Sequence, residues 1–303
     1  MIQILEKKVP SSDGVHQLAG KVYLPEGEKK GYFHVVHGMT EFIGRYDGFM
    51  TRLAEEGYVV FGYDHLGHGH TAEPDGSFGY IAHRDGWRLL VKDVAVFADA
   101  VRAEYGEMPY YLLGHSMGSF VVRLAAVMNP APDKLIVMGT GGPNPAAGAG
   151  LVMAKMIRGC KGEKSTSALL EALAFGAYNK HFQEEKDPIA WLTKDRAIRD
   201  KYRNDPFCTF RFTTSAMADL VSLNKTCNEK AHFDAFPKDL PVFFVSGTED
   251  PVGDYGKGVT TAAEELKKRN CKVSVKLYEN CRHEILNDSC REEVIADILA
   301  FLA

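Results

Sequence analysis

The sequence predicts an α/β protein with a mostly parallel sheet and helices on both faces. Short apolar runs alternate with helical patterns along most of the chain, which is typical of parallel strands joined by helices. At the beginning, two extended stretches near Gln3–Val9 and Val15–Leu24 flank the turn sequence SSDG and indicate an antiparallel hairpin. At 303 residues the chain is long enough to bury a sizeable core.

The expected strands after the hairpin are short and mostly apolar: Tyr32–Val36, Val59–Tyr63, Tyr110–Leu113, Leu135–Met138, Val242–Val245 and Val273–Leu277. The expected helices carry apolar residues at helical spacing: Tyr46–Glu56, Trp87–Tyr105, Ser119–Met128, Gly258–Arg269 and Arg291–Leu302. Near-continuous apolar strands are typical of a sheet covered on both faces. The carboxyl ends of such strands are where a site is expected.

The alternation is interrupted between Gly141 and Phe236. This stretch opens with GTGGPNPAAGAG and contains helical fragments but no convincing buried strand, and the strand pattern returns at LPVFFVSG. We therefore expect residues 1–140 and 237–303 to form the core and residues 141–236 to be a helical insertion. The Gly/Ala/Pro run at its start is expected to form a loop or hinge.

The composition is ordinary for a globular protein, with 45% hydrophobic residues, 25% charged residues and a formal net charge of −4. Because no block of like charges is present, nucleic-acid binding is not favoured. Early charged residues, and the lack of an apolar run of about 20 residues, favour a cytoplasmic protein without a secretory signal or membrane span. The 6 cysteines form no C-x-x-C pair and are expected to be free thiols.

Ser116 stands between two glycines, directly after a predicted buried strand, in the sequence YYLLGHSMGS. Gly114, Ser116 and Gly118 fit G-x-S-x-G, the nucleophile elbow, in which a sharp strand-to-helix turn exposes the serine hydroxyl. Side chains beside such a turn would collide, which accounts for the glycines. The predicted strand before the motif and the helix after it favour a nucleophile over a helix-capping serine.

A serine nucleophile needs a base to take its proton and an acid to orient that base. In folds with this elbow, the order along the chain is serine, acid, histidine. His283 is the only histidine after residue 232 and follows a predicted strand, so it is the expected base. The expected acid is Asp250 in SGTEDPVG, with Glu249 and Asp254 as alternatives on the same loop.

Two donors are also needed for the oxyanion of the tetrahedral intermediate. The backbone N–H of Met117, directly after the nucleophile, is the first expected donor. The second is the backbone N–H of Met39, because FHVVHGMTEFIGRY places this residue on the loop after an early strand. The alternative for this loop is a plain β-to-α turn.

Five sequences in this order, HGMTEFIGRY, YDHLGHGHT, GHSMGS, SGTEDPVG and RHEILND, resemble the monoacylglycerol lipase and lysophospholipase group of serine α/β-hydrolases over almost the full chain. The resemblance implies the α/β-hydrolase fold with a lid, or cap, at residues 141–236. It also implies the same catalytic residues: Ser116 as nucleophile, Asp250 as acid, His283 as base, and Met39 and Met117 as oxyanion donors. One departure is Phe42, where the group often has a second histidine.

Two further stretches invite a functional interpretation. The histidines of DHLGHGHT, which are His65, His68 and His70, lack the spacing and partner ligands of a metal site, so no metal is expected. In GAGLVMAKMIRG, Met153 and Met156 are candidate substrate-binding residues because methionine adapts to variable apolar ligands. This segment is expected to line an acyl tunnel or touch lipid aggregates; the alternative is packing of the cap onto the core.

The expected function is hydrolysis of a small-molecule ester with one acyl chain, a monoacylglycerol or lysophospholipid, through an acyl-enzyme and without a cofactor. One alternative is a short-chain or aromatic-acyl esterase. Another is a serine aminopeptidase, with Glu171, Glu184 and Glu185 as candidates to capture the substrate amine. The non-enzyme alternative is a catalytically silent small-molecule receptor. A dehalogenase or epoxide hydrolase is disfavoured because each needs a carboxylate where Ser116 stands.

Overall fold

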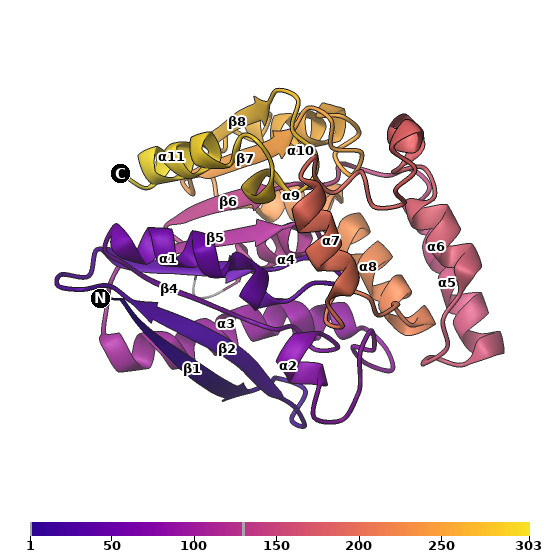
Figure 1. Ribbon diagram of the computed structural model, residues 1–303, viewed down its shortest axis with the longest axis horizontal. Helices are drawn as coiled ribbons and strands as arrows, with labels where there is room; N and C mark the ends of the chain where they lie inside the picture. The colour runs from indigo at the N-terminus through magenta and orange to yellow at the C-terminus, as the bar shows by residue number, and fades with distance from the viewer. Residues whose placement is uncertain (1, 129–130) are drawn as a thin grey trace.

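The computed structural model describes residues 2–128 and 131–303, and within these ranges eight strands form one sheet in the order β1-β2-β4-β3-β5-β6-β7-β8 (Figure 1). The strands are β1 Gln3–Pro10, β2 Gln17–Leu24, β3 Gly31–Val36, β4 Tyr58–Tyr63, β5 Tyr110–His115, β6 Lys134–Met138, β7 Val242–Gly247 and β8 Val273–Tyr278. Strand β2 is antiparallel to β1 and β4, and the pairs from β4 to β8 are parallel. The predicted fold class, hairpin and strands are confirmed.

The helices of the core cover both faces of this sheet. They include α1 Asp47–Glu55, α3 Gly86–Tyr105, α4 Met117–Ala125, α10 Lys257–Lys267 and α11 Arg291–Leu302, with the short elements η1 Ile43–Tyr46, α2 Gly69–Ala72 and η3 Ile285–Asn287. Helices α3, α4 and α10 pack on one face, and α1 and α11 on the other, in front of the strands in Figure 1. Among the described residues, no helix has both the length and the apolar character to span a bilayer.

Strand β3 shows how the sequence divides the core into these two layers. Tyr32 and Val36 pack in the layer of α3 and α4, whereas Phe33 and Val35 pack in the layer of α1 and α11. Successive side chains of a strand point to opposite faces, so an apolar run buried on both sides supplies both layers at once.

Residues 141–236, which we call the helical insertion, lie between β6 and β7 and occupy the side of the molecule away from both termini (Figure 1). They contain α5 Ala147–Lys161, α6 Ala168–Phe175, η2 Lys180–Glu185, α7 Arg196–Asn204, α8 Thr214–Cys227 and α9 Lys230–Ala235. The prediction of a loop at the start of the helical insertion is wrong in part. Residues 147–150 form the first turn of α5, because the alanines there favour a helix once Pro145 has been passed.

The prediction of free thiols is wrong for two cysteines, because Cys281 and Cys290 form a disulfide. The chain turns back between β8 and α11, so the two Cα atoms lie 6.5 Å apart although the residues are nine positions apart in the sequence. Cys160, Cys208, Cys227 and Cys271 are free.

A buried carboxylate joins the helical insertion to the core. Asp219 on α8 faces the backbone N–H groups of Gly86 and Trp87 at the start of α3. The approach is close, because a Cβ on Gly86 would lie 2.6 Å from Asp219 Oδ2. In the described part of the chain, this oxygen has no hydrogen-bond partner. Burial raises the pKa of Asp219 to about 7, although the N–H groups act in the opposite direction.

Asp219→Asn is therefore expected to stabilise the protein at alkaline pH. The pKa of this carboxyl rises from an ordinary value of 3.8 to about 7 on folding, so wild-type stability should fall as the pH rises between these values. The neutral amide avoids this penalty and keeps an oxygen for the N–H groups. In urea denaturation at pH 8, the free energy of unfolding should increase by about 1–2 kcal/mol. The difference should vanish near pH 4, and equal stabilities at pH 8 would contradict the prediction.

Candidate active site

Ser116 lies in the sharp turn between β5 and α4, with a φ of 54° and a ψ of −120°. A non-glycine residue in this backbone region is strained, and such strain is concentrated at functional sites. A Cβ on Gly114 would lie 2.3 Å from the carbonyl oxygen of Gly118, and a Cβ on Gly118 would lie 2.2 Å from that of Val36. Both positions therefore require glycine, and the strand-turn-helix geometry expected of the motif is present.

Asp250 and His283 meet at the carboxyl end of the sheet, on the loops that follow β7 and β8. His283 Nδ1 lies 3.0 Å from each carboxylate oxygen of Asp250. The carboxylate is fully buried and accepts hydrogen bonds from Ser246 Oγ at 3.0 Å and the backbone N–H of Val252 at 2.9 Å. Burial acts to raise the pKa of Asp250, but His283 and these hydrogen bonds outweigh it and lower the pKa. Asp250 is thus held as a carboxylate against the histidine.

The two alternative carboxylates on the β7 loop have other surroundings. Glu249 pairs with Lys194 at 3.0 Å, and the side chain of Asp254 is 66% exposed. Of the three acidic residues considered from the sequence, Asp250 is the one that contacts His283.

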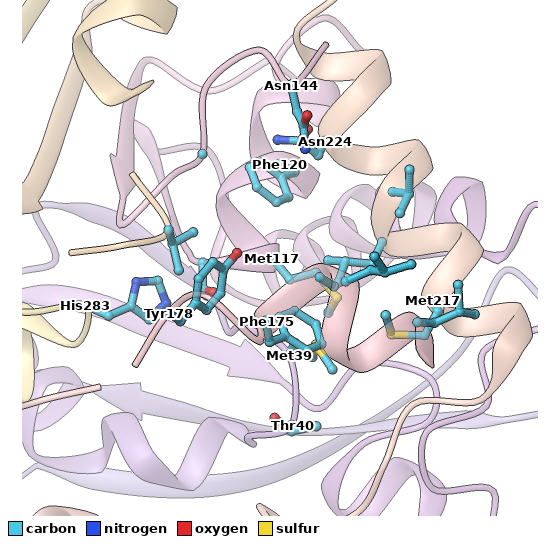
Figure 2. Close-up of a pocket in the computed structure, with 18 of the residues that line it drawn as sticks. Met39, Thr40, Met117, Phe120, Asn144, Phe175, Tyr178, Met217, Asn224 and His283 are labelled. Atoms are coloured by element: carbon cyan, nitrogen blue, oxygen red, sulfur yellow. The ribbon is translucent and has the colours of Figure 1, made fainter. Parts of the chain in front are cut away.

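Ser116 and His283 line a pocket of about 520 Å³ together with Met39 and Met117. Figure 2 shows His283 at one end of this space, with Met39 and Met117 between it and Met217 of α8. A Cβ on Gly38 would lie 2.9 Å from Ser116 Cβ, so the loop after β3 approaches the elbow closely. In the described chain, the Ser116 hydroxyl and the His283 ring make no hydrogen bond with each other; such contacts are often looser before substrate binds.

The wall of the pocket away from His283 is mostly apolar, with Asn144 and Asn224 as polar exceptions, and comes largely from helices α5, α6 and α8 of the helical insertion. It includes Met153, Leu170, Leu173, Phe175, Met217 and Leu220. A pocket of this volume, with apolar walls and a few polar groups at one end, is typical of a small-molecule site.

A buried polar network centred on Glu41 lies behind the loops of the site. Glu41 Oε1 accepts hydrogen bonds from the backbone N–H of Gly38 at 2.5 Å and the Tyr46 hydroxyl at 2.9 Å, and it lies 3.2 Å from His115 Nδ1. Glu41 Oε2 accepts a hydrogen bond from Arg45 at 2.8 Å. Burial opposes the charge on Glu41, but His115 and Arg45 outweigh it and lower its pKa. The same contact raises the pKa of His115 despite its burial.

Arg45 extends this network to the loop of His283. Its guanidinium donates two hydrogen bonds to Glu284, at 2.8 and 2.7 Å, and His115 Nε2 lies 3.3 Å from the His283 carbonyl oxygen. The network therefore connects the loop after β3, the elbow and the histidine loop. Sequence reasoning missed it, although Glu41 and Arg45 stand four residues apart in HGMTEFIGRY, a spacing typical of an ion pair.

Comparison with known proteins identifies the family of this chain. Residues 27–290 match the family model described as Serine aminopeptidase, S33. The chain belongs to this family. The monoglyceride lipase of Rattus norvegicus is 34% identical over 274 residues, which cover 90% of this chain and 81% of the relative. A monoglyceride lipase homolog of Monkeypox virus is 26% identical over 281 residues, which cover 92% of this chain and 91% of the relative.

Among solved structures, a highly thermostable carboxyl esterase from Bacillus coagulans in complex with glycerol has a TM-score of 0.93 and 30% sequence identity. The match covers 99% of this chain and 97% of the esterase. The predicted α/β-hydrolase fold and the resemblance to the monoacylglycerol lipase group are confirmed.

Phe42, where the lipase group often has a histidine, packs against the helical insertion. Its ring lies 5.2 Å from the ring of Phe207, edge to face, and Phe207 also contacts His70. The departure from the usual sequence thus replaces a polar group behind the loop with aromatic packing between core and insertion.

The histidine-rich loop packs beside the site. The rings of His65 and His68 are buried and lie 4.4 and 5.2 Å from the ring of His37, and burial lowers the pKa of both. His70 is exposed and pairs with Glu73. Within residues 2–128 and 131–303, no group of three His, Cys, Asp or Glu side chains is arranged to hold a metal ion.

The two candidate methionines of α5 face different surroundings. Met153 lines the pocket, whereas Met156 is 66% exposed. The single segment considered from the sequence thus contributes both to the pocket wall and to the outer surface.

Glu41→Gln is expected to lower the free energy of unfolding at pH 7 by about 2–4 kcal/mol, because it leaves His115 without a buried counter-charge and leaves Arg45 with Glu284 alone. The matched control is Glu264→Gln, which removes a carboxylate 2.9 Å from Lys267 on the surface. That change should cost less than about 0.5 kcal/mol. Urea denaturation measures both, and similar losses in the two variants would refute a central role for Glu41.

Proposed function

We propose that the protein hydrolyses carboxylic esters of single-acyl-chain lipids, with monoacylglycerol or lysophospholipid as the substrate class. The observation that carries this proposal is the pocket itself: Ser116 and His283 lie at its polar end, and its far wall is mostly apolar. The names of the relatives, two of them monoglyceride lipases or homologs, support the same activity, as does the similarity to a carboxyl esterase.

In the proposed mechanism, His283 Nε2 takes the proton of Ser116 as the hydroxyl oxygen attacks the ester carbonyl. Asp250 accepts a hydrogen bond from His283 Nδ1, which fixes the tautomer and stabilises the imidazolium. The N–H groups of Met39 and Met117 stabilise the oxyanion. His283 then protonates the leaving alcohol, and afterwards activates the water that hydrolyses the acyl-enzyme and releases the fatty acid.

We assign residues 141–236 the role of a cap that covers the pocket and contacts the acyl chain. Helices α5 and α6 also carry exposed apolar side chains that do not line the pocket: Val152 is 59% exposed, Met156 66% and Leu169 56%. An apolar surface of this kind next to an apolar pocket suits transient contact with a lipid aggregate.

The aminopeptidase alternative has less support from the charges in the pocket. A substrate amine requires a free carboxylate in the pocket, but Glu171 pairs with Arg211 and Glu185 with Arg199, and Glu184 is exposed outside the pocket lining. The carboxylates that line the pocket, Glu41 and Glu284, are both bound to Arg45. Ester hydrolysis needs no such group and is therefore the better match.

Ser116→Ala is expected to lower kcat at least about 1,000-fold on p-nitrophenyl esters and on a monoacylglycerol, because the acyl-enzyme cannot form. Wild-type kcat/KM should rise with acyl-chain length. Steady-state rates over a series of chain lengths test both statements. Turnover that survives in Ser116→Ala would refute the proposed nucleophile, and activity confined to short or aromatic esters would refute the lipid substrate class.

Substitution of the two methionines should separate pocket binding from surface contact. Met153→Ser is expected to lower kcat/KM about 10-fold for a dodecanoyl ester while sparing a butanoyl ester, because it removes apolar contact from the pocket wall. Met156→Ser should spare both soluble esters and lower only the rate on emulsified monoacylglycerol. Rates on soluble and emulsified substrates provide the measurement. Identical profiles for the two variants would contradict the assignment.

A further inference from the structure

Thr40, which directly follows the proposed oxyanion donor Met39, has a φ of 49°. This left-handed conformation is unfavourable for a β-branched residue and persists only where neighbouring groups hold it. The backbone at Thr40, directly after the residue that bears the proposed donor N–H, is therefore held by contacts from outside the loop. Figure 2 shows Thr40 close to Met39 at the edge of the pocket.

Tyr202 on α7 of the helical insertion supplies such contacts. Its hydroxyl donates a hydrogen bond to the Thr40 carbonyl oxygen at 2.9 Å and lies 2.8 Å from Thr40 Oγ1. Because a phenol has one hydrogen, the second bond is donated by the Thr40 hydroxyl to the Tyr202 oxygen. The backbone and the side chain of Thr40 are thus both bound to one atom of the helical insertion.

Tyr202 is itself held in place by the core. The guanidinium of Arg45 lies 4.9 Å from the centre of its ring, in cation–π contact. Arg45 is fixed in turn by its ion pairs with Glu41 and Glu284. The position of the Tyr202 hydroxyl is therefore set by the buried network and by α7 together.

A second contact between the helical insertion and the core involves the loop of His283. The carbonyl oxygen of Trp191 accepts a hydrogen bond from the His283 N–H at 3.4 Å, and that of Leu192 accepts one from the Glu284 N–H at 2.7 Å. Both loops of the site are thus bound to the helical insertion when it is seated on the core.

We propose that Tyr202 is a positioning residue for the oxyanion loop: its hydroxyl holds Thr40 in the left-handed conformation and so fixes the carboxyl-terminal side of Met39, the residue whose N–H is the proposed oxyanion donor. The oxyanion site is then complete only while the helical insertion is packed on the core. Closure of the insertion over the pocket is thereby coupled to catalysis. This inference rests on the proposed function, in which Met39 is an oxyanion donor.

The test compares Tyr202→Phe with a matched control. Tyr202→Phe keeps the ring over Arg45 and removes only the hydroxyl. Tyr80→Phe removes a hydroxyl that also joins core and insertion, through a 2.9 Å hydrogen bond to Glu163. Tyr202→Phe should lower kcat about 10-fold, with KM within about twofold, equally on p-nitrophenyl butyrate and on a monoacylglycerol. Tyr80→Phe should change neither parameter by more than about twofold.

A second comparison isolates the backbone of Thr40. Glycine adopts positive φ without strain, so in a Thr40→Gly background the oxyanion loop no longer needs the Tyr202 hydroxyl to hold it. Addition of Tyr202→Phe to Thr40→Gly should therefore lower kcat less than about threefold, against about 10-fold in the wild-type background. The full loss in both backgrounds would overturn the proposal. A loss confined to the monoacylglycerol would also overturn it, because Tyr202 would then contact the alcohol group of the substrate directly.

The rate at which a fluorophosphonate labels Ser116 separates this proposal from the proposed function. Labelling requires a phosphoryl oxygen to enter the oxyanion site but requires no acyl ester. It should slow in Tyr202→Phe and recover when Thr40→Gly is added. If the wild type is labelled but hydrolyses no lipid ester, the substrate assignment fails while the labelling rates still decide the role of Tyr202. Unchanged labelling in Tyr202→Phe would overturn that role.

Discussion

The buried carboxylate of Glu41 is the interaction on which the arrangement of the site depends. Removing a charge from water is costly unless hydrogen bonds and an opposite charge replace the water. Here the replacements come from Gly38, Tyr46, His115 and Arg45, which lie on the loop after β3, in η1 and at the end of β5. Because one carboxylate binds all of them, these segments cannot shift independently without leaving a buried charge unpaired.

The core and the helical insertion supply different parts of the site. The core supplies the elbow, the Asp250–His283 pair and the polar network, whereas the insertion supplies most of the apolar wall. The insertion also touches the polar end, through Tyr202 on Thr40 and through Trp191 on His283. Under the proposed function, a change in the insertion would therefore affect the chemistry as well as the choice of acyl chain.

The sequence alone was sufficient to predict the structure where a local pattern of residues is compatible with only one conformation. The apolar strands and the glycines around Ser116 are of this kind, because the crowding of that turn excludes other residues. It was insufficient where distant segments meet. The disulfide between Cys281 and Cys290 depends on how the chain turns back before α11, and the bond between Tyr202 and Thr40 joins residues 162 positions apart. Neither leaves a periodic or spacing signal in a single sequence.

The charges at the polar end of the pocket bear on which lipid is the better substrate. Among the described residues that line the pocket, Arg45 is the one arginine or lysine, and both of its carboxylate partners, Glu41 and Glu284, line the same pocket. Their two negative charges outweigh its positive charge, and the contact with Glu41 raises the pKa of His115, which offsets the excess negative charge when it is protonated. An anionic phosphate head group would meet these carboxylates without a free cation to pair with, whereas the hydroxyl groups of a glycerol can donate hydrogen bonds to them. Within the proposed substrate class, the electrostatics therefore favour a monoacylglycerol over a lysophospholipid.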